Sequence, residues 1–331
     1  MVYPISESTP RKRTREEKSV LQDKIFTRKF VIERGVEQKD IRVEPFRFIH
    51  DIFQANQWTS LFVPVNAYTR LVREFYYNID EIDLVGPPSF TTKVFEKTLN
   101  ITTELISEVI GIPLTNEKPL PFLEEDPQPT KAEIMAVLNP SQQLVWDEDL
   151  NKIPIGYVRA PERLLTRILL QNIWPMSRHS HVTIERAIMI YGIINRVEFC
   201  LCTHLVLTMI ELHEDHSIAL PYDGLITKIL HAILPKIAAN ERMEAPEGYF
   251  GKATVMKSNA QLRLHAPAVQ APPLAQDSPA ASSSGSSDIS SQLTKIIDLL
   301  QTQGQSIEAI NTRLTNLEKD VKSIKESFWQ E

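Results

Sequence analysis

Residues 198–213 read EFCLCTHLVLTMIELH and contain the longest apolar run of the chain. In a helix, this stretch would place apolar side chains on nearly every side, so other elements must surround it. We therefore expect it to be the central helix in the second half of a multi-helical domain. The run is too short to span a bilayer, which needs about 20 residues. The sequence thus predicts a soluble protein without a membrane partner.

Further helical patterns surround this stretch and predict a C-terminal helical subdomain over residues 131–252. Their boundaries are residues 131–138, 160–173, 182–196 and 220–234.

Residues 15–112 predict an N-terminal helical subdomain. A helix is expected to begin near Thr14, with an apolar face that extends to Phe30. Helical patterns also cover residues 50–57 and 65–79, the second with apolar side chains on one side and charged ones elsewhere.

A change of composition within this subdomain predicts one small β-hairpin near residues 82–99. The segment is rich in β-branched and aromatic residues, and the turn sequence GPPS at 86–89 interrupts it. Thr102 or Thr103 can then cap a short helix that ends at Gly111.

Two segments of biased composition divide the chain further. Residues 113–130 contain five prolines and three consecutive acids, which predicts a surface loop or a hinge between the subdomains. Residues 253–288 lose the helical pattern, and the Pro, Ala and Ser content of residues 266–287 is typical of a disordered linker. The predicted fold class is therefore mainly α, with a small β-hairpin, a linker and a C-terminal coiled-coil helix.

The coiled coil is predicted by a heptad register over residues 289–328. Eleven of its twelve seam positions are apolar, and only another helix can cover such a stripe. The seam residues are Ile289, Leu293, Ile296, Leu300, Gln303, Ile307, Ile310, Leu314, Leu317, Val321, Ile324 and Phe328.

This seam predicts a homo-oligomer. Leu is the commonest residue at a and Ile the commonest at d, which favours trimers or tetramers. Ile307 and Val321 at a, with Leu317 at d, favour dimers. The range from dimer to tetramer therefore stays open. The alternative is that the helix folds back onto its own domain.

The N-terminus is basic. Residues 1–14 predict a disordered arm, and Arg11, Lys12, Arg13 and Arg15 fit a nuclear-localisation or nucleic-acid-binding pattern. The alternative is an ordinary solvated charge run. Residues 43–150 hold seven Lys and Arg against seventeen Asp and Glu, so any nucleic-acid contact should come from the arm. Localisation is predicted to be intracellular, in the nucleus or the cytoplasm.

No catalytic residue, metal site or cofactor is predicted. With ten glycines in the whole chain, a phosphate-cradling loop is not indicated, and no Gly-x-Ser-x-Gly elbow occurs. Cys200, Cys202 and His204 resemble metal ligands only in composition, because residues two apart on a helix face different sides. Two cysteines also indicate a reducing compartment. We interpret this cluster as buried core residues.

Several short motifs resemble a family found in plant genomes. The stretch LVREFYYN at 71–78, the NIWP at 172–175 and the GIP at 111–113 carry the likeness, over roughly residues 30–240. The motif residues, which we interpret as packing residues, are Trp58, Leu71, Arg73, Phe75, Tyr76, Asn78, Gly86, Gly111, Arg163, Asn172, Pro175 and Tyr191.

The family that these motifs resemble is the Putative plant transposon protein domain, found in retroelement-derived, Gag-like open reading frames. The resemblance implies a plant source and a transposable-element origin, and it supplies no catalytic residues. Where the family has a basic turn, this chain has Val85-Gly86-Pro87-Pro88.

Three functions follow as hypotheses. The first is a non-enzymatic structural protein that self-associates through its tail and contacts protein partners. The second is a nuclear DNA-associated factor that uses the basic arm. The third is a transposase-like nuclease, which would need three carboxylates around a metal ion.

Overall fold

The computed structural model describes residues 25–115, 118–139, 151–176, 178–214, 219–234, 236 and 241–265. The chain divides into one compact unit over residues 1–267 and a second over 268–331, and all described residues belong to the first. The predicted arm, the linker from residue 266 onward and the coiled coil lie outside the described residues.

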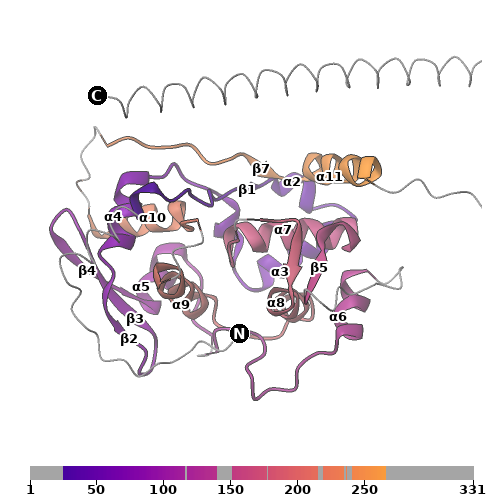
Figure 1. The fold of residues 1–331 in the computed structure, drawn as a ribbon, viewed down its shortest axis with the longest axis horizontal. Coiled ribbons are helices and arrows are strands. Elements are labelled where there is room, and N and C mark those ends of the chain that lie inside the picture. The colour runs from indigo at the N-terminus through magenta and orange to yellow at the C-terminus, as the bar shows by residue number, and fades with distance from the viewer. Residues whose placement is uncertain are drawn as a thin grey trace, which may run out of the picture. The chain divides into compact units, whose positions relative to one another are not determined.

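The described part is mainly helical, as predicted, and contains short strands (Figure 1). The α-helices are α2 (Gln38–Ile41), α3 (Arg47–Ala55), α4 (Thr69–Tyr77), α5 (Thr103–Ile110), α6 (Lys131–Leu138), α7 (Ala160–Asn172), α8 (Ile184–Ile194), α9 (Leu201–Glu214), α10 (Asp223–Ile233) and α11 (Lys252–His265). Short 3-10 helices are η1 (Thr59–Phe62) and η2 (Ile155–Tyr157). The strands are β1 (Gly35–Val36), β2 (Asp80–Asp83), β3 (Ser89–Val94), β4 (Lys97–Thr102), β5 (Lys152–Pro154), β6 (His181–Thr183) and β7 (Tyr249–Phe250).

Helix α9 is buried along nearly its whole length, as its apolar pattern predicted. It packs against α5, and α10 packs against α4 and α5. Figure 1 shows α4, α5, α9 and α10 on the same side of the unit as the β2–β4 sheet, with α7 and α8 on the other side. Because α5 comes from the first half of the sequence and α9 and α10 from the second, both halves contribute to one core.

The loop over residues 113–130 therefore does not separate two independent cores. Its Lys118 carbonyl accepts a hydrogen bond of 2.7 Å from the Cys200 amide at the start of α9. Pro121 and Phe122 lie so close to Gly192 of α8 that a Cβ added there would meet the Pro121 Cβ at 2.4 Å. The loop is packed against the helices of the second half.

The predicted hairpin is part of a larger sheet. Strands β2, β3 and β4 form an antiparallel sheet, and Gly86, with φ of 85°, lies in the turn between β2 and β3. Strand β4 pairs with β3 through partners such as Phe90 and Ile101. The hairpin interpretation missed β4 because Lys97, Thr98 and Asn100 weaken its apolar alternation.

Helix α5 has the ends that its sequence indicated. The Thr102 side chain accepts a hydrogen bond of 3.2 Å from the Leu105 amide, which caps the N-terminus. Gly111 ends the helix with φ of 67°, a left-handed conformation that glycine adopts without steric cost.

Two expected boundaries were wrong. The linker was expected from residue 253, but α11 continues to His265, because its Val255 and Ser258 side chains are buried against the body. The first helix was expected to reach Phe30, but helical residues end at Thr27, and Phe30 forms a parallel β-bridge with Leu220. Pairing with a distant segment overrides the local helical pattern there.

Candidate anion-binding site

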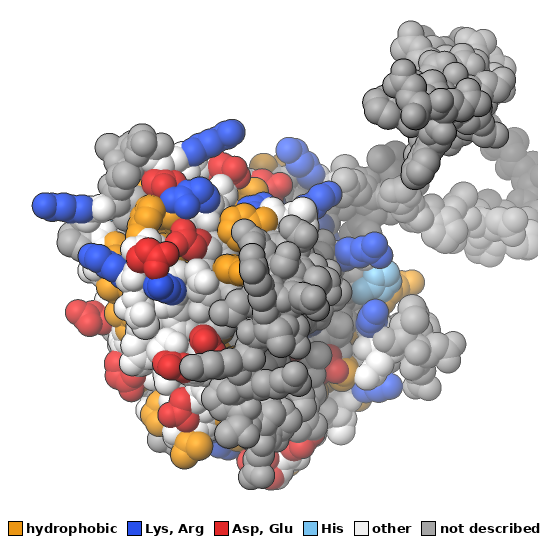
Figure 2. Space-filling view, turned by 60° about the vertical axis from the view of Figure 1, so that its left-hand side comes forward, with side chains coloured by type: hydrophobic (Ala, Val, Ile, Leu, Met, Phe, Trp, Pro, Cys, Tyr) orange, Lys and Arg blue, Asp and Glu red, His pale blue; other side chains and the backbone are white. Residues whose placement is uncertain are grey.

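Figure 2 shows one face of the molecule. On the coloured part of this face, acidic and basic side chains are interspersed, and neither sign of charge dominates. Among the described residues, no group of three or more His, Cys, Asp and Glu side chains is arranged to hold a metal ion. A search of the same residues finds no helix with the length and hydropathy needed to cross a membrane.

The apolar motif residues lie in the core. Trp58 is 4% exposed and contacts Phe199 edge-on, with ring centroids 5.5 Å apart. Leu71, Phe75 and Tyr76 are fully buried on one face of α4. The Tyr76 hydroxyl donates a hydrogen bond of 3.2 Å to the Pro221 carbonyl, which fixes α4 against the segment before α10.

Most polar motif residues hold backbone carbonyl groups. The Arg73 guanidinium donates to the carbonyls of Phe26 and Arg28, at 3.0 and 2.9 Å, and stacks over the Phe30 ring. The Pro175 carbonyl accepts from Arg186 at 3.3 Å, and the Tyr191 ring lies near Phe122. Gly86 and Gly111 occupy the turns described above. These contacts stabilise the fold.

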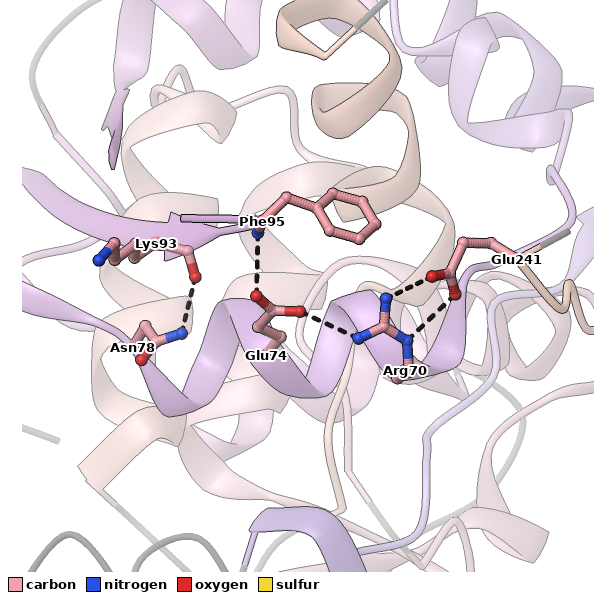
Figure 3. Close-up of polar contacts among 6 residues, drawn as sticks. All are labelled: Arg70, Glu74, Asn78, Lys93, Phe95 and Glu241. Carbon is pink, nitrogen blue, oxygen red and sulfur yellow. Dashed lines mark hydrogen bonds and ion pairs between the residues drawn. The ribbon is translucent and has the colours of Figure 1, made fainter. Parts of the chain in front are cut away.

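The exposed side of α4 binds two remote segments (Figure 3). Glu74 accepts a hydrogen bond of 2.9 Å from the Phe95 amide, in the turn between β3 and β4, and Asn78 donates to the Lys93 carbonyl at 2.7 Å. Arg70 contacts both Glu74 and Glu241. Since Arg70, Glu74 and Asn78 each have a protein partner, we interpret this edge as structural.

The Cys200, Cys202 and His204 cluster is buried, as predicted, and both cysteines are free. The His204 ring contacts the Trp174 ring edge-on, with centroids 5.1 Å apart, and lies 3.4 Å from the Thr208 hydroxyl. Burial lowers the pKa of His204 to about 3, so this imidazole is neutral at physiological pH.

Two carboxyl groups meet at the N-terminus of α10. The Glu33 carboxylate accepts a hydrogen bond of 2.8 Å from the Leu225 amide, and the Asp223 carboxylate accepts from the amides of Glu33 and Gly224 at 3.1 and 3.0 Å. Burial, with the nearby charge of Asp223 acting in the same direction, raises the pKa of Glu33 to about 7. Burial also raises the pKa of Asp223. The pair caps a helix and makes folding sensitive to pH.

A second polar cluster consists of Arg34, Arg163 and Arg167, which we call the arginine cluster. Arg163 and Arg167 are one helical turn apart on α7, on the side that packs against α11. Arg163 donates to the Val158 carbonyl at 3.2 Å and to the Asn259 side chain. Arg167 donates to the Ser258 hydroxyl at 3.3 Å.

Arg34 lies just before β1, and its charge acts on Arg167. Its guanidinium stacks over the Phe250 ring, 4.2 Å from the ring centre, and donates to the Tyr249 carbonyl at 3.4 Å. Burial lowers the pKa of Arg167, and the positive charge of Arg34 lowers it further. Burial also lowers the pKa of Arg163, and the positive charge of Arg167 acts in the same direction. The charge of Arg167 therefore interacts with that of Arg34 and with that of Arg163.

The cluster has no counter-charge among the described residues. No described Asp or Glu forms an ion pair with any of the three arginines. Within the same part of the chain, the Nε atoms of Arg34, Arg163 and Arg167 are buried without a hydrogen-bond partner. A buried charge without a partner is costly, so this arrangement favours a bound anion.

The sequence indicated only part of this cluster. Arg163 was named through the family resemblance, and Arg167 could have been added because it lies four positions after Arg163 on an expected helix. Arg34, Ser258 and Asn259 gave no local signal, since a parallel pairing of β1 with β7 and the packing of α11 bring them together.

A comparison with protein families matches residues 54–233, more than half of the chain, to the family described as Putative plant retrotransposon-related domain. This match covers the segment from the end of α3 to the end of α10. Comparisons with curated proteins and with solved structures return no match.

Proposed function

We propose a function from the premise that this chain belongs to the plant retrotransposon-related domain family and is derived from a transposable element. The proposed function is that of a non-enzymatic structural protein, comparable in role to a Gag-type protein, which assembles through its C-terminal helix and presents its helical body to protein partners.

The heptad seam over residues 289–328 is the observation that carries this proposal. It lies beyond the family match, which ends at residue 233, and beyond α11. A seam with one polar position, Gln303, gains stability when several chains cover it together. Linking several bodies in this way would multiply weak contacts through avidity.

The structural role of the motif residues supports the same proposal. Trp58, Tyr76 and Arg73 hold core and backbone groups in place, so the sequence features that mark the family maintain a shape. A family domain defined by its packing is suited to presenting a surface.

Light scattering after size exclusion of the full chain tests this proposal. The wild type should have the mass of two to four chains. The double variant Leu300→Lys with Leu314→Lys should be monomeric, because it places charges in the seam. A matched control, Gln301→Lys with Thr315→Lys, adds the same charges one position further, outside the seam, and should remain oligomeric. A monomeric wild type would reject the proposal.

A nuclear, DNA-associated factor is the second candidate, and the basic run of Arg11, Lys12, Arg13 and Arg15 favours it. Replacing these four residues with Gln should abolish salt-sensitive DNA binding and nuclear accumulation of a fluorescent fusion. Unchanged binding and localisation would reject this candidate and leave a cytoplasmic role.

A further inference from the structure

The arginine cluster contains more positive charge than the surrounding protein neutralises. Arg163 is 3% exposed, yet its guanidinium contacts only neutral groups among the described residues: the Gly156 and Val158 carbonyls and the Asn259 amide oxygen. Its buried Nε donor has no partner among the described residues. An arginine so placed is ordinarily paired with a carboxylate or with a ligand.

The geometry of the cluster suits a ligand with several oxygens. Arg34, Arg163 and Arg167 come from two segments of the chain, and Ser258 of α11 approaches Arg167 with a hydroxyl group. Guanidinium groups bind tetrahedral oxyanions through paired N–H donors, and a phosphate carries enough oxygens to contact more than one of them.

His179 indicates that the site is cationic. Its Nε2 lies 2.8 Å from the Met176 carbonyl, and burial lowers its pKa, with the charges of Arg167 and Arg34 acting in the same direction. An imidazole carries no negative charge in either protonation state, so His179 does not offset the charge of the arginines.

We propose that Arg34, Arg163 and Arg167, together with Ser258, form a binding site for a phosphate group. The ligand supplies the negative charge that the described protein groups around the cluster lack. A phosphate of this chemistry is available either as free phosphate or on a nucleic-acid backbone. The proposal does not depend on self-association through residues 289–328.

Calorimetric titration of the full chain with inorganic phosphate, at constant ionic strength set with chloride, tests the site. The wild type should bind phosphate. Arg167→Gln and Arg34→Gln should each weaken binding by about tenfold or more, since each removes a charge-assisted donor. Arg167→Lys should weaken it less, because the charge is kept while the planar donor pair is lost.

The matched control is Arg47→Gln, which removes an exposed arginine that pairs with Asp51 on α3. It should bind phosphate like the wild type. Circular dichroism identifies any variant that fails to fold, and Arg34→Gln, at a partly exposed position, keeps the test available if Arg167→Gln unfolds. No binding to the folded wild type, or equal binding to all variants, would overturn the proposal.

A second titration identifies the source of the phosphate. A labelled single-stranded oligouridine is added to the same proteins, and its anisotropy is followed. Binding that Arg167→Gln weakens, and that inorganic phosphate competes with, would assign the site to a nucleic-acid backbone. If the Arg→Gln variants lose phosphate binding but keep oligouridine binding, the site would be assigned to free phosphate.

Discussion

The Asn172 side chain forms hydrogen bonds with both backbone polar groups of Arg34, the amide and the carbonyl. The Asn172 side-chain oxygen accepts from the Arg34 amide at 3.1 Å, and its amide nitrogen donates to the Arg34 carbonyl at 2.7 Å. Asn172 is the last residue of α7, and Arg34 directly precedes β1. The Asn172 side chain thus satisfies the backbone of Arg34 as a neighbouring strand would. This pairing fixes the position of Arg34 relative to Arg163 and Arg167 on the same helix.

Asn172→Ala should therefore destabilise the fold. Both backbone groups of Arg34 would lose their partners in a partly buried place, at a cost of about 1–3 kcal/mol. Urea denaturation measures the change. The control is Asn195→Ala, which removes an exposed hydrogen bond to the Tyr191 carbonyl and should cost much less. Equal losses for the two variants would contradict the role given to Asn172.

Glu33 should make stability depend on pH. Its pKa is raised from 4.5 to about 7 in the folded state, so the folded protein holds a proton that the unfolded chain releases. The stabilising contribution is complete below about pH 4.5, falls as the pH rises to about 7 and is lost above that value.

Glu33→Gln removes this titration and keeps an oxygen that can accept from the Leu225 amide. The free energy of unfolding at pH 8 should rise by roughly 3 kcal/mol, and the slope between pH 4.5 and 7 should flatten. The control is Glu37→Gln, at a residue that pairs with Lys39 on the surface, which should retain the slope. An unchanged slope in Glu33→Gln would show that Glu33 is not the titrating group.

The close contact of Gly192 with Pro121 gives a third prediction. Gly192→Ala places a methyl group 2.4 Å from the Pro121 Cβ, so the loop must move, at a cost of about 1–3 kcal/mol. Adding Pro121→Gly, which removes that atom, should recover part of the loss in a double-mutant cycle. Thermal unfolding of the four proteins measures the coupling. Strictly additive effects would mean that the loop does not pack on α8.

Local chemistry made α5, α7 and α9 predictable. Thr102 and Gly111 mark the ends of α5, and the pattern of α9 is apolar on almost every side. The strand β4 and the helix α11 were not predictable in the same way. Strand β4 gains its conformation from β3, and α11, whose own sequence is weakly apolar, is held by α7.

The polar clusters were not predictable for a related reason. Glu33 and Asp223 are 190 residues apart, and Arg34 is 138 residues from Asn172, so no spacing in the sequence marks either contact. Arg73 and Arg163 were visible through the family resemblance, but their roles, stacking on Phe30 and donating to Asn259, depend on segments brought together only by folding.

Sedimentation equilibrium of the full chain, from low to high micromolar concentration, tests the proposed assembly most directly. If several chains cover the seam over residues 289–328, the fitted mass should rise with concentration to a plateau between two and four times that of one chain. A fitted mass of one chain at every concentration would contradict the proposed assembly.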